Sequence, residues 1–166
     1  MQIGRMLAGA SEACRADAAR PGPAVLSLAR MFEPFALIGS VSRMLDEHCP
    51  PARDAYGVGR SAAGNALRAL AGACGPGVIL RHCPQPSDEH LKRVDAAWRI
   101  ELLMACDEDL EAIAAAMVEL AAALQDALSA IAGDDTVMPA QRTTARTLLD
   151  EATDVWGHYG GDSGGW

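Results

Sequence analysis

Aromatic residues are scarce in this sequence: they make up 4% of its 166 residues, although half of all residues are hydrophobic. A core must therefore be built from Ala, Leu, Ile, Val and Met. This composition favours packed helices over a β-sandwich or barrel, which depend on aromatic and β-branched residues. The length fits one domain with a sizeable core. The sequence predicts an all-α fold, a single-domain bundle of four to five helices over residues 1–159.

Lysine is almost absent, since Lys92 stands alone against thirteen arginines, which we interpret as the composition of a GC-rich bacterial genome. The net charge of −8 is unevenly placed: residues 1–82 carry +3 and residues 83–166 carry −11. Nucleic-acid binding needs a basic surface, so this balance argues against a nucleic-acid partner. The acidic half can attract the basic half of a second copy or another basic partner; a solvated acidic helix face is the plainer interpretation.

Long uninterrupted apolar runs are also missing, so we expect no segment long enough to cross a membrane, and no membrane partner. The first fourteen residues are broken by Gly4, Arg5, Gly9 and Glu12, which is unlike the apolar region of a signal peptide. Five cysteines form no disulfide-framework spacing. Reduced thiols in a cytoplasmic protein are therefore expected.

Motifs of catalysis are lacking as well. Each histidine lacks a Glu three residues before it, as the Glu-x-x-His motif of di-iron bundles requires. The segment Gly57-Val58-Gly59-Arg60 lacks the Gly-Lys-Ser/Thr ending of a phosphate-binding loop. No nucleophile–base pair or cofactor fingerprint is recognisable. The sequence predicts a protein that is not an enzyme and needs no cofactor.

What the sequence does contain is a long helical pattern at about 88–132. Ser87 is a good N-cap, Asp88 and Glu89 suit the first turn, and Gly133 suits the end. No proline or glycine interrupts this stretch. Apolar residues alternate at spacings of four and three along one stripe, formed by Cys106, Leu110, Ile113, Met117, Leu120, Leu124, Ala127 and Ile131. Such a stripe is typical of a helix packed along a partner helix. The sequence predicts one long central helix.

The same stripe gives the main functional hypothesis. A strict heptad pattern in a helix longer than its neighbours favours binding to another protein, or to a second copy as a homodimer. The predicted partner-binding residues are Leu110, Ile113, Met117, Leu120, Leu124 and Ile131. Bacterial adaptors, chaperones and immunity-type proteins fit this description.

Local signals mark the remaining elements. Helical spacing predicts helices over 2–19, 24–48, 52–74 and from Pro139 onward, and Pro34 predicts a kink or break near Met31–Glu33. Glycines in the third stretch, including Gly59, can permit close approach of a neighbouring helix. Residues 78–80 fit a short strand or a helix equally well. Residues 160–166 form a glycine-rich tail that we expect to be disordered.

Two His-Cys-Pro triplets give an alternative hypothesis, a bundle that binds a metal or a small molecule. The triplets and two nearby residues supply nitrogen and sulfur ligands for a tetrahedral metal. The candidate ligands are His48, Cys49, Cys74, His82, Cys83 and His90. No Cys-x2-Cys pair is present, and His48 also fits a helix C-terminus stabilised by the helix dipole.

Overall fold

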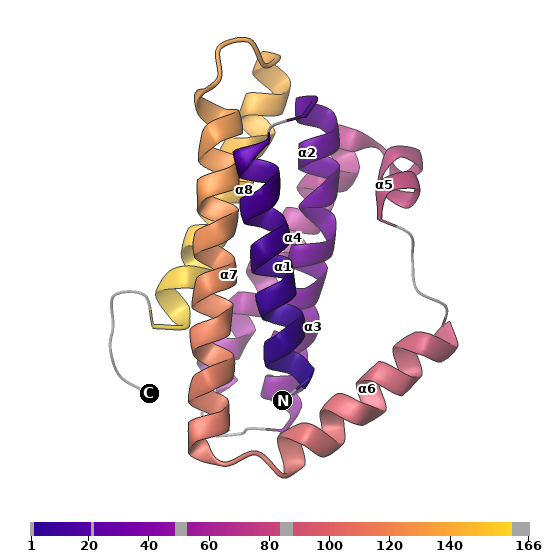
Figure 1. The fold of residues 1–166 in the computed structure, drawn as a ribbon, viewed down its shortest axis with the longest axis vertical. Helices are drawn as coiled ribbons and strands as arrows, with labels where there is room; N and C mark the ends of the chain where they lie inside the picture. Colours follow the sequence, from indigo (N-terminus) through magenta and orange to yellow (C-terminus); the bar gives the residue numbers. More distant parts are fainter. Residues whose placement is uncertain (1, 21, 49–52, 84–87, 161–166) are drawn as a thin grey trace.

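The protein is all-helical in the computed structural model, which describes residues 2–20, 22–48, 53–83 and 88–160. Eight helices occur within these ranges (Figure 1). They are α1 (Gln2–Ala19), α2 (Ala24–Arg30), α3 (Phe32–His48), α4 (Arg53–Cys74), α5 (Pro76–His82), α6 (Asp88–Leu103), α7 (Asp107–Gly133) and α8 (Pro139–His158). The all-α prediction is confirmed, whereas the expected count of four to five helices is too low.

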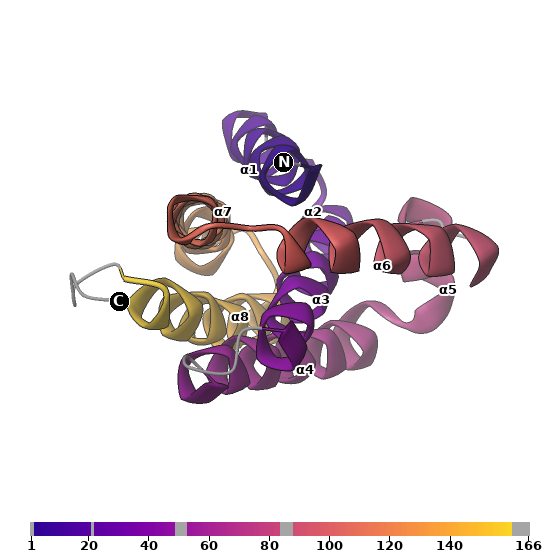
Figure 2. The same ribbon diagram turned by 90° about the horizontal axis from the view of Figure 1, so that it is seen from below.

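Five of these helices form an upright bundle. Packing is most extensive between α7 and α8, α3 and α4, α1 and α7, and α4 and α8. Seen from below, α1, α7, α8, α4 and α3 surround a common centre (Figure 2). The short helix α5 and the helix α6 lie to one side, and α6 runs obliquely across the lower end of the bundle (Figures 1 and 2).

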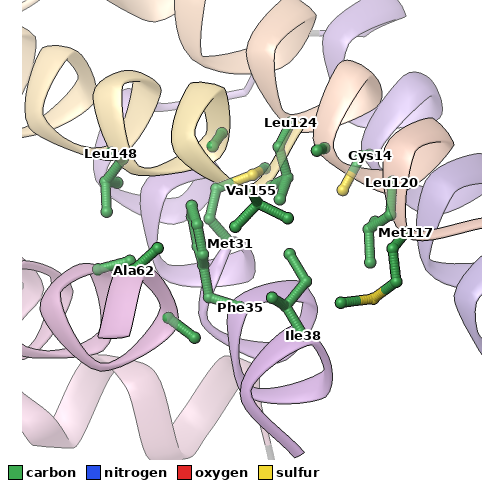
Figure 3. Packing of buried hydrophobic residues seen from close by; sticks show 14 of the residues in the cluster. Cys14, Met31, Phe35, Ile38, Ala62, Met117, Leu120, Leu124, Leu148 and Val155 are labelled. Carbon is green, nitrogen blue, oxygen red and sulfur yellow. The ribbon is translucent and has the colours of Figure 1, made fainter. Parts of the chain in front are cut away.

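The core is built almost without aromatic residues, as the composition requires. Figure 3 shows Phe35 and Ile38 of α3 meeting aliphatic side chains of α7 and α8, such as Leu124 and Val155. Each of these four side chains is fully buried. Burying a side chain of this size contributes about 1.5–3 kcal/mol, so this cluster is a main source of the bundle's stability.

Small residues bring α3 and α4 close together. A Cβ added at Gly59 would lie 2.5 Å from Ser42 Oγ and 3.0 Å from Tyr159 Cε2. A Cβ at Gly39 would lie 3.1 Å from the Cβ of Ala63. The expectation that glycine in the third helical stretch permits close helix approach is confirmed at Gly59.

The predicted single helix over 88–132 is wrong. The chain leaves the helix at Met104, and Cys106 adopts an extended conformation (φ −91°, ψ 173°) as the N-cap of α7. The Asp109 carboxylate accepts the Cys106 backbone N–H at 3.1 Å and its thiol at 3.2 Å. Asp107, Glu108 and Asp109 place three acids in the first turn, where the helix dipole favours them. A capping box therefore divides the stretch into two helices.

The local predictions made from Pro34 and Pro139 are confirmed. The predicted break falls at Met31, between α2 and α3, and Pro34 lies in the first turn of α3, where its missing N–H removes no hydrogen bond. Residues 78–80, left open between strand and helix, belong to α5. Pro139 is the first residue of α8. The candidate N-cap Ser87 and the tail 161–166 lie outside the described residues.

Two stretches are long and apolar enough to cross a membrane by length and composition: Ala24–His48, which joins α2 and α3, and α7. The expectation that no segment reaches this threshold is wrong. Half of each apolar window is buried inside the bundle, and core helices of soluble proteins pass the same test. The prediction that the protein has no membrane partner remains a prediction.

Candidate interaction surface at the α6–α7 elbow

The stripe predicted to bind a partner lies inside the chain's own core. Met117, Leu120 and Leu124 are fully buried, Ile113 is 1% exposed and Ile131 is 8% exposed. Leu110, at the lower end of α7, is half-buried. The helices that cover α7 are α1 and α8 (Figure 2). The stripe's packing partners are therefore helices of the same chain, and a partner-binding surface has to be sought elsewhere.

Among the described residues, the predicted metal ligands do not gather at one site: Cys74 and Cys83 both lie against α2, but His48 lies apart from them. His48 ends α3 near the start of α4, whereas Cys74 ends α4. A helix of 22 residues is about 33 Å long, so these two lie at opposite ends of the bundle. Within the described ranges, no three His, Cys, Asp or Glu side chains are placed to hold an ion. His82 is exposed, while Cys49 and the side chain of His90 lie outside the described residues.

The two described cysteines of that set have a structural environment. Cys74 Sγ faces the Val25 carbonyl at 3.7 Å, and Cys83 Sγ donates to the Ala29 carbonyl at 3.3 Å. Both thiols thus rest on successive turns of α2. Burial raises the pKa of each thiol above its usual value. A raised thiol pKa disfavours the thiolate that metal binding and nucleophilic attack require.

A small pocket of about 100 Å³ lies between α1, α2 and α7. Its lining includes Asp17, Ser27 and Asp134. Asp17 accepts a 2.6 Å hydrogen bond from Arg30, and Asp134 accepts bonds from the backbone and hydroxyl of Thr136. Ligand pockets commonly measure about 300–1,000 Å³, so this one is too small for a typical cofactor or metabolite.

Exposed apolar side chains gather instead where α6 meets α7. Ile100 is 62% exposed, Leu103 71% and Met104 81%. Six large apolar side chains are exposed in the described part of the chain, and these three of them lie within residues 100–104. The others, Met6, Leu80 and Met138, come from three different helices or loops. A cluster of this kind marks an interaction site more often than single exposed residues do. We call these three residues the apolar centre.

Charged residues flank the apolar centre on both sides. Helix α6 carries the exposed carboxylate of Glu89 and three exposed cations, which we call the basic arm: Lys92, Arg93 and Arg99. Three exposed carboxylates lie in the first turns of α7, which we call the acidic arm: Asp107, Glu108 and Glu111. The apolar centre and its two arms together form the elbow surface.

The opposite face of α6 fixes it to the bundle at a few points. Trp98 and Leu102 are 4% and 5% exposed, and Asp95 accepts a 2.7 Å hydrogen bond from Arg43 of α3. The Glu101 carboxylate accepts the backbone N–H of Gln2 at 2.9 Å and of Ile3 at 3.1 Å. A carboxylate at this position accepts hydrogen bonds from the first N–H groups of α1 and is stabilised by the positive end of the α1 helix dipole.

This attachment is imperfect. The indole N–H of Trp98, on the buried face of α6, has no hydrogen-bond partner. An unsatisfied buried polar group costs about 1–3 kcal/mol. The docking of α6 is therefore weaker than its two buried side chains alone would give. Helix α6 is held in place, yet it keeps one whole face toward solvent.

Sequence reasoning missed the elbow surface because it joined α6 and α7 into one helix. The signal that could have found it is the run Cys106 to Asp109, an N-cap residue followed by three acids. Comparison of the chain with protein-family models, curated protein sequences and solved structures finds no match.

Proposed function

We propose that this protein acts without catalysis, as a helical bundle that binds another protein or a second copy of itself through the elbow surface. Adaptors, chaperones and immunity-type proteins are the classes that fit such a module. A cytoplasmic location and a bacterial origin belong to the same proposal. It keeps the kind of function that the sequence suggested and moves the contact from the α7 stripe to the elbow surface.

The observation that supports it is the apolar centre. Leu103 and Met104 are more than two-thirds exposed, whereas long aliphatic side chains in the core, such as Leu7, Leu28 and Leu120, have no exposed surface. Each exposed Leu or Met side chain forgoes about 1.5–3 kcal/mol of burial energy. A partner that covers this surface recovers that energy, which makes it a natural contact point.

A comparison of co-purifying proteins tests the proposal. The full chain, carrying an affinity tag, is purified from its native cells alongside a Leu103→Glu/Met104→Glu variant and a Met138→Glu control, whose residue is also 61% exposed. We expect the bound protein, foreign or an untagged copy, to be lost from the elbow variant and kept by the control. Equal recovery with all three chains would contradict the proposal.

A further inference from the structure

The elbow surface carries charges of both signs, in an order that bears on its partner. Going along the chain, it passes from the basic arm through the apolar centre to the acidic arm. Arg99 lies four residues before Leu103, and Asp107 lies four residues after it. Glu89 is also exposed on α6, so along the chain the charge is approximately antisymmetric about Leu103, with one carboxylate on the basic side. This inference rests on the proposed function and concerns the partner at the same surface.

Such an arrangement is complementary to itself. In a two-fold dimer the same patch of both copies is in contact, and each residue meets a different one across the axis. An axis near Leu103 places one apolar centre against the other. The same rotation sets the basic arm of each copy opposite the acidic arm of its partner, so every charge pairing occurs twice.

The charged groups on the elbow surface remain able to make these contacts. Arg99 pairs with Asp95 of its own helix at 3.5 Å, a long contact that leaves other guanidinium N–H groups available. Glu108 and Glu111 are exposed. By contrast, the Asp109 carboxylate of α7 is occupied at Cys106 and is not counted in the acidic arm. On α6, the Asp95 carboxylate is occupied at Arg43.

Other partners match only part of the surface. An anionic membrane would attract the basic arm and repel the three carboxylates beside the apolar centre, on a chain with a net charge of −8. A foreign partner of one charge sign would likewise meet one favourable and one unfavourable arm. A second copy satisfies both arms at once.

We propose that a second copy of this chain docks on the elbow surface as a two-fold dimer, with each basic arm against the partner's acidic arm. The apolar centre is small, so the contact belongs to the weak end of specific interfaces and dissociates at about micromolar concentrations. Because the charged arms are exposed, salt weakens the dimer.

Sedimentation velocity of the full chain over about 1–300 µM tests the dimer, at low salt and at about 0.5 M salt. We expect a concentration-dependent shift from monomer to dimer that salt reduces. Arg99→Glu and Glu108→Arg each place like charges across the axis and should weaken the dimer about tenfold. The combined variant restores opposite charges and should recover most of that loss, while Met138→Glu should leave the dimer unchanged.

Several results would overturn the dimer. They are a monomer at every concentration, a combined variant that is no tighter than either single one, or a Met138→Glu control that is equally weakened. Circular dichroism of each variant checks the helical fold, and recovery in the combined variant cannot arise from misfolding. Flotation with phosphatidylserine vesicles is measured in parallel. Vesicle binding by the wild type that is lost in Leu103→Glu would assign the surface to a membrane and reject the second copy.

The two proposals fail in distinguishable ways. A monomer at every concentration, combined with capture of a foreign protein that Leu103→Glu/Met104→Glu loses, rejects the dimer and leaves the proposed function standing. A monomer whose co-purifying proteins do not respond to the elbow substitutions rejects both.

Discussion

At the scale of single residues, the molecule depends on close contacts that a sequence pattern can only suggest. Gly59, Ser42 and Tyr159 meet where α3, α4 and the end of α8 converge. Ser42 Oγ and the Tyr159 hydroxyl are 2.8 Å apart and buried. Burial raises the pKa of the Tyr159 phenol above its usual range, so the hydroxyl stays protonated. Helical spacing predicted that Gly59 lies in a helix, but the identity of its neighbours is set by tertiary packing.

Gly59→Ala should destabilise the protein. The new methyl group would lie 2.5 Å from Ser42 Oγ, so the Ser42–Tyr159 contact must shift. Such overpacking costs about 1–3 kcal/mol, more than the gain of up to about 1 kcal/mol in helix propensity. The control is Gly57→Ala, whose methyl group meets no atom within 4 Å and should stabilise α4. Urea unfolding measures both; a Gly59→Ala chain as stable as Gly57→Ala would contradict the packing described here.

Cys14 should make the stability depend on pH in alkaline solution. Burial, followed by the nearby Asp17 carboxylate, raises the pKa of its thiol from 9.0 to about 12. Because the folded pKa is the higher one, the thiol's contribution is complete below pH 9 and is lost as the pH rises from 9 toward 12. The unfolding free energy should therefore fall with pH in this window, by up to about 1.4 kcal/mol per pH unit for one such group.

The contribution of Cys14 can be isolated by substitution. Cys14→Ala removes the titrating thiol and should make the alkaline decline shallower, while Cys106→Ala, at an exposed cysteine, serves as the control. Urea unfolding at pH 8, 9 and 10 measures the slope. Parallel slopes for the wild type and Cys14→Ala would show that the buried thiol is not the group responsible.

At the scale of helices, the sequence was informative wherever a local signal decides the outcome. The ends of α1, the break at Met31 and the start of α8 at Pro139 follow from prolines and apolar spacing. The division between α6 and α7 was missed because the apolar stripe continues across it. Asp109 and Cys106 decide that division, and their capping box competes with a helix pattern that is equally good on both sides. The spacing of apolar residues therefore cannot predict whether the helix continues through Cys106 or ends before it.

Glu101 links two helices, and its removal should loosen both. Glu101→Ala leaves the N–H groups of Gln2 and Ile3 without their carboxylate and should lower the unfolding free energy by about 1 kcal/mol. Because Glu101 also attaches α6, we expect amide hydrogens in α1 and α6 to exchange faster. We also expect acrylamide to quench the fluorescence of Trp98 more easily, measured in a chain whose other tryptophans are replaced by Phe. Asp126→Ala, on the exposed face of α7, is the control. Unchanged exchange in α6 would contradict the attachment.

At the scale of the whole molecule, a hydrophobic stripe shows that a face is buried and does not show what covers it. The α7 stripe was correctly identified as a packing surface, since Met117, Leu120 and Leu124 are fully buried. Its cover turned out to be α1 and α8 of the same chain, which a heptad pattern cannot distinguish from another molecule. The residues of the elbow surface show no comparable heptad pattern in the sequence. The surface exists because α6 turns away from α7 and uses only one face to meet the bundle.

Hydrogen–deuterium exchange of the full chain at low and high protein concentration is the most direct test of where this protein makes contact. If partners bind the elbow surface, amides around residues 96–108 should become more protected as the concentration of a second copy, or of a co-purified partner, rises. Amides of residues 113–131 should be equally protected at every concentration, because they lie in the core of one chain. Protection that instead increases along residues 113–131, with residues 96–108 unchanged, would contradict the account.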